Sequence, residues 1–221
     1  MAEHSYLIVA NGHWPDEEIW RPLVKSANHV VACDGAAHQC LENHVIMQTV
    51  IGDMDSLSKE TQTQIQTDSK VEFLRKEGQD ENDLVKALRW SIDSGASSID
   101  IFGIEGGDLA HQFAAILALC EVPSNARLHT SKCTIELVPK GGYKNCSIEK
   151  NTVFSLFSIG DVNGLEITGA KWNLKNETLR AGTQGLHNQT KDECLEIIFL
   201  QGNCYFSWIV DSGKCSRSIA E

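Results

Sequence analysis

The order of apolar and polar residues divides the chain into two regions. In roughly the first 125 residues, short β-branched runs alternate with helical stretches, an order typical of a parallel sheet flanked by helices. The clearest predicted helix spans Asn82–Ser94, and another spans Leu109–Leu119. The predicted strands are Ser5–Ala10, Val30–Cys33, Thr49–Ile51, Val71–Leu74, Ile99–Phe102 and Arg127–Thr130.

From about Gly141 onward, the helical periodicity fades and short strands are separated by Gly, Asn and Asp. This pattern predicts an antiparallel β unit with strands at Val153–Ile159, Leu195–Leu200 and Cys204–Val210. We therefore expect two domains, at residues 1–138 and 139–221, packed against each other.

The charge balance excludes some classes of partner. The chain has 221 residues, with 19 basic and 30 acidic side chains and a formal net charge of −11. Nucleic-acid binding is disfavoured because clustered Lys and Arg are missing. No segment approaches the roughly 20 apolar residues that a membrane span needs.

Eight cysteines are scattered through the chain without a C-x-x-C pair. The short apolar run at Tyr6–Ala10 has no basic region before it, so no signal peptide is expected. We expect a reduced cytoplasmic protein in which cysteines act as small core residues, in preference to a disulfide-bonded one.

Acidic residues follow four of the predicted strands. They occur in Asp34-Gly35, in Gly52-Asp53-Met54-Asp55-Ser56, in Gln79-Asp80-Glu81-Asn82-Asp83, and in the loop from Gly103 to Asp108. Ligands of open parallel sheets bind beyond the carboxyl ends of the strands. Five or more acids on one rim would repel one another unless a cation offsets them, which favours a hard divalent metal.

Each loop also has a plainer interpretation. In an extended segment, Asp53 and Asp55 would lie on the same side and could bind one Mg²⁺ together. In the plainer interpretation the segment is a turn, and Asp55 or Ser56 only caps the helix that follows. In the plainer interpretation, Asp80 and Asp83 would only stabilise the N-terminus of the helix through its dipole. The Gly106-Gly107 pair would be a phosphate cradle or only a loop. Their recurrence at the same end of successive strands favours the functional interpretation.

Several known signatures are missing from the sequence. The chain has no G-x-x-x-x-G-K-[ST] and no G-x-G-x-x-G, which disfavours P-loop kinases and dinucleotide dehydrogenases. It also has no H-E-x-x-H, no Cys/His zinc spacing and no G-x-S-x-G. Of the reaction classes considered, metal-assisted phosphoryl transfer is the one that these missing signatures do not disfavour.

Over nearly its whole length the sequence resembles the thiamine pyrophosphokinase family. The resemblance rests on the acidic motifs above, on Gly106-Gly107, on Thr168-Gly169-Ala170-Lys171-Trp172-Asn173-Leu174, on Gly182-Thr183 and on His187-Asn188. It implies a Rossmann-like α/β domain with a mostly parallel sheet, followed by an antiparallel β-sandwich. It also implies transfer of diphosphate from ATP to thiamine, giving thiamine diphosphate and AMP.

The same resemblance implies the site residues. Asp53, Asp55 and Asp83 would hold Mg²⁺, and Asp34 and Asp80 would help to set the site. Either Asp55 or Asp80 would accept the hydroxyl proton. Further residues that would contact the substrates are Gly35, Gln79, Gly106, Gly107, His111, Trp172, His187 and Asn188.

Thiamine would bind in the β domain. Trp172 would stack on its aminopyrimidine or face its cationic ring, although a lone Trp in a sandwich would otherwise belong to the core. In the family this pocket lies between subunits, so the resemblance implies a homodimer.

One loop departs from the family pattern. The family usually reads G-G-R-x-D-[HQ], whereas this chain has Asp108 in place of the Arg and Ala110 in place of the Asp. The alternatives to an active kinase are therefore a weakened homologue that binds thiamine or a nucleotide, and another Mg²⁺-dependent nucleotide enzyme on the same scaffold.

Overall fold

The computed structural model describes residues 4–67, 71–76, 78 and 80–209 of the chain. It divides into two compact units, residues 1–131 and 132–221, which we call the α/β unit and the β unit. No helix within the described ranges is long and apolar enough to cross a membrane.

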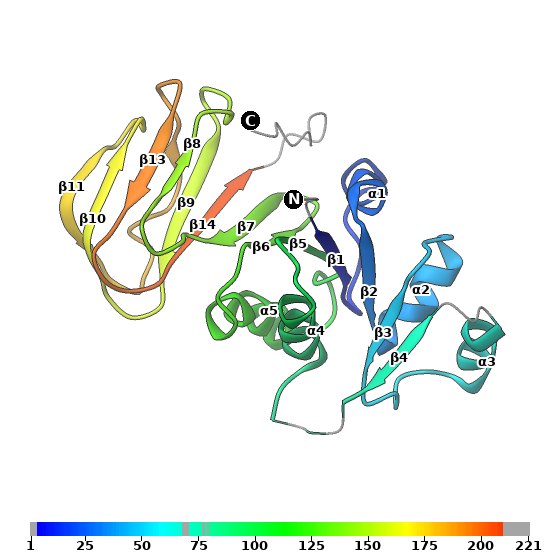
Figure 1. Ribbon diagram of the computed structural model, residues 1–221. Coiled ribbons are helices and arrows are strands. Elements are labelled where there is room, and N and C mark those ends of the chain that lie inside the picture. The colour runs from blue at the N-terminus through cyan, green and yellow to red at the C-terminus, as the bar shows by residue number, and fades with distance from the viewer. Residues whose placement is uncertain (1–3, 68–70, 77, 79, 210–221) are drawn as a thin grey trace. The chain divides into compact units, whose positions relative to one another are not determined.

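The α/β unit is built on a parallel sheet with the strand order β6-β5-β1-β2-β3-β4 (Figure 1). The strands are β1 (Ser5–Val9), β2 (His29–Cys33), β3 (Thr49–Gly52), β4 (Glu72–Arg75), β5 (Ser98–Phe102) and β6 (Ala126–His129). Every pairing between them is parallel. All six predicted strands are confirmed within one or two residues at each end.

The inner strands owe their places to burial on both faces. Strands β1, β2, β3 and β5 are buried along almost their whole length. Continuous apolar runs such as Leu7-Ile8-Val9 suit a sheet that helices cover on both sides. The outer strand β4 is partly exposed, as its polar ends require.

Helices connect these strands. They are α1 (Glu17–Ser26), η1 (Asp34–Ala36), α2 (Ala37–Glu42), α3 (Lys59–Thr67), α4 (Asp83–Asp93) and α5 (Leu109–Glu121). Helix α4 packs on β1, β2 and β3 through a face that includes Leu84 and Leu88, and it lies beside α5 (Figure 1). The two predicted helices are thus confirmed.

The β unit contains two antiparallel sheets. One has the order β12-β9-β14-β7 and the other β11-β10-β13-β8. Their strands are β7 (Cys133–Leu137), β8 (Tyr143–Asn145), β9 (Val153–Ser158), β10 (Val162–Thr168), β11 (Leu174–Leu179), β12 (Asn188–Gln189), β13 (Leu195–Ile198) and β14 (Cys204–Ile209).

Alternating burial in this unit shows how the two sheets make a sandwich. In β9, Phe154 and Leu156 are buried while Phe157 is exposed. These two side chains belong to one core cluster with Leu165 of β10 and Ile197 of β13, which come from the other sheet. The predicted antiparallel sandwich is therefore confirmed.

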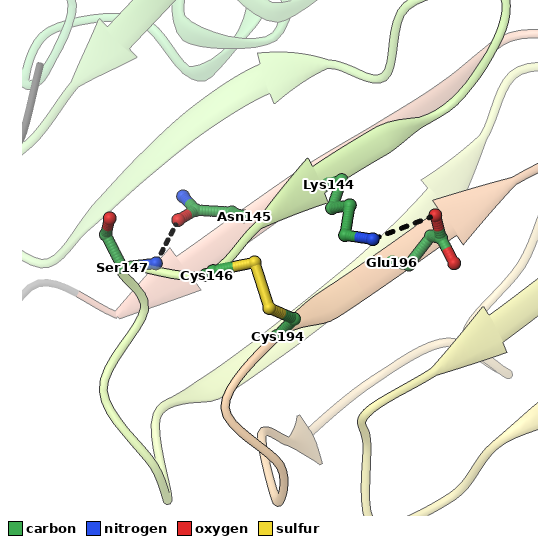
Figure 2. The surroundings of a disulfide bond; sticks show 6 residues. All are labelled: Lys144, Asn145, Cys146, Ser147, Cys194 and Glu196. Atoms are coloured by element: carbon green, nitrogen blue, oxygen red, sulfur yellow. Dashed lines mark hydrogen bonds and ion pairs between the residues drawn. A yellow bond between two sulfur atoms is a disulfide. The ribbon is translucent and has the colours of Figure 1, made fainter. Parts of the chain in front are cut away.

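The expectation that the cysteines are reduced was wrong for one pair. Cys146 and Cys194 form a disulfide (Figure 2). In the antiparallel register of β8 and β13, Asn145 lies opposite Leu195, so the residue after Asn145 and the residue before Leu195 also lie opposite each other. This pairing across strands is set by the sheet register, which the spacing of cysteines in the sequence does not show.

Three other cysteines agree with the expected core role. Cys33, Cys40 and Cys204 are buried thiols. Burial raises the pKa of Cys40 and of Cys204 to about 12, because the thiolate would lose its hydration. These groups are therefore inert at neutral pH.

Candidate active site

The α/β unit has a cavity of about 610 Å³ at the carboxyl ends of its parallel strands. Its lining comes from the segments after β1, β2, β3, β4 and β5 and from the N-terminal halves of α4 and α5. The predicted site residues that line it are Asp34, Asp53, Asp83, Gly106, Gly107 and His111.

Asp34 is the buried acid of this site. Its side chain follows β2, and only 3% of the residue is exposed. Oδ2 accepts a 2.8 Å hydrogen bond from the Met54 backbone, while Oδ1 accepts one from Gly35. Burial and then the nearby charge of Asp83 raise the pKa of Asp34 above its ordinary value. Asp34 thereby ties the loop after β2 to the loop that carries Asp53.

The two acids of the G-D-x-D-S motif have different environments. Asp53 lines the cavity, and its Oδ1 accepts a 3.0 Å hydrogen bond from the Asp55 backbone N–H. Met54 between them adopts a left-handed conformation, with φ 70°. Of the two alternatives, an extended segment and a turn, the structure has the turn, and Asp55 is not among the cavity-lining residues.

In the acidic segment before α4, too, one predicted acid lines the cavity and the other does not. Asn82 caps the helix, since its Oδ1 accepts a 2.9 Å bond from the Val85 backbone, which leaves Asp83 available to line the cavity. Asp83 forms a 3.0 Å ion pair with Lys86. Asp80 is exposed and does not line the cavity. Gln79 lies outside the described residues.

Two glycines let the neighbouring loops approach closely. Gly106 has φ +76°, and a Cβ there would overlap the ring of His13. A Cβ on Gly35 would overlap the side chain of Asn11. The absence of a side chain on Gly35 therefore leaves room for Asn11, while Gly35 itself does not line the cavity.

Asp108 has a structural role that the sequence comparison did not show. It is the N-cap of α5, and its Oδ1 accepts a 2.9 Å hydrogen bond from the Ala110 backbone. An Asp at this position also suits the positive end of the helix dipole. The same side chain lines the cavity, so it adds negative charge there.

The sequence analysis missed the cavity-lining residues after β1 and a cation on α4. Asn11, Gly12 and His13 line the cavity, although they follow the first predicted strand as the acidic loops follow theirs. Applying the strand-end rule to polar residues of every kind would have found them. Lys86 was missed because α4 was examined only for its apolar face and its acids.

Glu105 belongs to one of the acidic loops of the sequence analysis, which gave it no role of its own, and it joins two loops of the α/β unit. Its Oε2 accepts hydrogen bonds from the backbone N–H of Ser131 at 2.7 Å and from the Ser131 hydroxyl at 3.1 Å. It also lines the cavity.

The donor set of this cavity fits Mg²⁺. Among the described residues, no group of three His, Cys, Asp or Glu side chains is close enough to enclose a metal ion. Mg²⁺ does not need such a cage, because it usually takes one or two carboxylates together with phosphate oxygens and water. Asp53 and Asp83 supply carboxylates, and both raise the pKa of Asp34, so a cation would relieve their repulsion.

The β unit has its own cavity, of about 510 Å³, lined partly by core residues such as Phe154 and Leu156. Trp172 and Asn188 also line it. Asn188 fixes the backbone of Trp172 twice, accepting from its N–H at 3.1 Å and donating to its carbonyl at 2.8 Å. Trp172 is 55% exposed, which excludes the interpretation of this residue as core.

Lys171 and His187 are the chain neighbours of the cavity-lining residues Trp172 and Asn188. The Nζ of Lys171 lies 4.5 Å from the centroid of the Trp172 ring, so one face of the indole already has a cation. His187 does not line the cavity. It has φ 59°, and its backbone N–H donates a 3.1 Å bond to Ser155 Oγ, which makes it a turn residue next to Asn188.

Comparisons with known proteins agree with this arrangement. Residues 20–131 match the family model "Thiamin pyrophosphokinase, catalytic domain", and residues 132–202 match "Thiamin pyrophosphokinase, vitamin B1 binding domain". The two matches meet where the two units meet.

Individual relatives give the same result. The thiamine pyrophosphokinase of Bacillus subtilis (strain 168) is 27% identical over 157 residues, which cover 69% of this chain and 73% of that protein.

Solved structures share the fold. The Bacillus subtilis thiamine pyrophosphokinase structure has a TM-score of 0.79 at 24% identity, covering 94% of this chain and 99% of that one. The yeast thiamin pyrophosphokinase structure has a TM-score of 0.78 at 16% identity, covering 97% and 89%. With both domain models matched in order along more than half of its length, the chain belongs to the thiamin pyrophosphokinase family of ATP-dependent diphosphotransferases.

Proposed function

We propose that this chain transfers diphosphate from ATP to thiamine, giving thiamine diphosphate and AMP, with ATP and Mg²⁺ in the cavity of the α/β unit. The observation that carries the proposal is the grouping of Asp34, Asp53 and Asp83 at the strand ends of a unit that matches the catalytic domain. Thiamine would occupy the cavity of the β unit, which matches the vitamin B1-binding domain.

The acids of the α/β unit would hold and place the metal. Asp53 and Asp83 would bind Mg²⁺ directly, and Asp34 would order the loop of Asp53 through its bond to Met54. When bound, the metal neutralises charge on the phosphate oxygens during the transfer. Asp55 as a metal ligand, and Asp55 or Asp80 as proton acceptor, stay predictions.

The residues of the β unit would orient the vitamin. Trp172 presents an exposed indole whose backbone Asn188 fixes. Since Lys171 already occupies one side of the ring, the aminopyrimidine of thiamine is a better stacking partner than its cationic thiazolium. The further residues expected to contact a substrate, Gly35, Gln79, Gly106, Gly107, His111 and His187, stay predictions.

The test is AMP formation from ATP with and without thiamine. Thiamine-dependent AMP supports the proposal. Tight thiamine binding without turnover would indicate the weakened homologue, and AMP or ADP release that ignores thiamine would indicate another nucleotide enzyme. Asp53→Asn should lower kcat at least about a hundredfold, while Asp93→Asn, at the exposed end of α4, should not. An unaffected Asp53→Asn enzyme would contradict the metal site.

We further propose a homodimer in which each active site combines two subunits, and a cytoplasmic location. Mixing Asp53→Asn protein with Trp172→Ala protein, assayed at a thiamine concentration well below the raised KM of the Trp172 variant, should give more activity than either protein alone if one subunit supplies the α/β unit and the other the β unit of a site. No recovery after subunit exchange would contradict the shared site. The disulfide bears on the proposed location, because cytosolic cysteines are mostly reduced. Thiol trapping in intact cells tests whether Cys146 and Cys194 are reduced, as a cytoplasmic location predicts.

A further inference from the structure

The cavity of the α/β unit holds a partly buried cation that the proposed metal site does not explain. Lys86 lies in the first turn of α4, and only 9% of its side chain is exposed. Its Nζ donates to Asp83 Oδ1 at 3.0 Å. Among the described residues that line this cavity, Lys86 is the one Lys or Arg.

Helix stability is only a weak reason for a lysine at this position, since an i,i+3 ion pair such as that with Asp83 contributes little. The first turn is the positive end of the helix dipole, where a cation is unfavourable and an acid is favourable. Asn82 already caps the helix, and Asp83 already supplies the favourable acid. Partial burial of an ammonium also removes part of its hydration. A residue that breaks a local rule inside a cavity is a candidate for a role in binding.

The charge of the cavity suggests what Lys86 binds. Six carboxylates line it, those of Asp34, Asp53, Glu81, Asp83, Glu105 and Asp108. A polyphosphate entering this lining meets a field of its own sign. An ammonium has three N–H donors, and the bond to Asp83 uses one of them. The remaining donors suit phosphate oxygens.

We propose that Lys86 binds the phosphate oxygens of the nucleotide, with Asp83 holding the ammonium in place. This inference rests on the proposed function, which assigns ATP to this cavity. Asp83 then has two partners, the metal and Lys86, and Lys86 is the local positive charge that admits an anion among the acids. The competing explanation is that Lys86 only neutralises Asp83.

The two explanations differ in their effect on phosphate binding. The probes are the Mg²⁺ complex of α,β-methylene-ATP, which carries the phosphates but cannot transfer them, and adenosine, which lacks them. Lys86→Met should weaken binding of the methylene analogue by about tenfold to a hundredfold, the range for a lost charge-assisted hydrogen bond. Its affinity for adenosine and for thiamine should not change. Lys86→Arg should restore most of the loss.

A matched control is Lys25→Met. Lys25 is exposed at the last turn of α1 and does not line the cavity, so this variant loses the same charge without an effect on either probe. Lys86→Gln serves as a second variant, judged by the same ratio of the two affinities, if Lys86→Met does not fold. Thermal unfolding of each variant measures the structural contribution separately.

The outcomes separate this inference from the proposed function. If Lys86→Met binds the methylene analogue like the wild type, or loses affinity for both probes equally, the inference is overturned. If the wild type makes no AMP with thiamine but Lys86→Met still loses phosphate affinity selectively, the proposed reaction fails and the role of Lys86 stands.

Discussion

Asp108 combines two effects that can be measured separately by two substitutions. Its carboxylate caps α5 through the 2.9 Å bond to Ala110, and its charge lines the candidate ATP cavity. Asp108→Asn keeps a good N-cap and removes the charge, whereas Asp108→Ala removes both. The Asn variant should therefore differ from the wild type in nucleotide binding alone, and the Ala variant in binding and stability.

The stability effect follows from the cap. Replacing an Asp N-cap by Ala lowers the free energy of unfolding by about 1 kcal/mol, whereas Asn is about as good an N-cap as Asp and leaves it nearly unchanged. Urea unfolding followed by circular dichroism at 222 nm is a suitable assay, because all helices of the described residues lie in the α/β unit. Equal stability of the Asn and Ala variants would refute the capping argument.

The binding effect follows from the charge. A unit charge about 6 Å from a phosphate group, in a dielectric close to that of water, contributes about 0.7 kcal/mol. Both variants should therefore lower KM for ATP by about threefold at low salt, and the difference should fade at about 0.5 M salt. An unchanged or raised KM in both variants, at low salt, would refute the electrostatic argument for Asp108.

Three further predictions concern the β unit and the stability of the whole chain. Trp172→Ala should raise KM for thiamine about tenfold, as expected for a lost aromatic contact, while Trp172→Phe keeps most of it; equal KM in all three proteins would remove Trp172 from the thiamine site. Replacing Cys146 and Cys194 together by Ser should lower the free energy of unfolding by up to about 4 kcal/mol, the chain-entropy value for a separation of 48 residues; identical urea curves for the wild type with and without reductant would contradict this. Burial lowers the pKa of His29 below 6.5, despite the opposing charge of Glu72. Because the unfolded chain then binds the proton more readily, the free energy of unfolding should be at its full value above about pH 7 and fall as the pH drops through 6.5. His29→Gln should flatten this pH dependence, and a slope like that of the wild type would contradict the assignment to His29.

The sequence allowed the prediction of elements whose burial leaves a clear pattern. The strands of the parallel sheet are continuous apolar runs, such as Leu7-Ile8-Val9, and α4 has apolar residues at helical spacing. Helix α3 (Lys59–Thr67) is different, because Ile65 is its one buried apolar residue among those whose burial is described. Helix α1 contains Pro22, a residue that helix propensity disfavours.

The site could be predicted in its location but not in its details. Strand ends identify the loops, and three of the expected acids line one cavity. Which acid of a pair faces the cavity depends on backbone conformation, and the left-handed Met54 separates Asp53 from Asp55. Such conformations have no clear signal in the sequence. The Cys146–Cys194 disulfide depends likewise on strand register.

Two backbone hydrogen bonds join the loop after β1 to the loop after β5. Gly12 N–H donates to the carbonyl of Gly103 at 2.5 Å, and His13 N–H donates to that of Glu105 at 2.6 Å. A Cβ on Gly12 would overlap the carbonyl oxygens of Gly103 and Glu105, and one on Gly106 would overlap His13. Substitutions in one loop should therefore be non-additive with those in the other. Among relatives of this chain, the two segments should change together, as covarying positions far apart in the sequence.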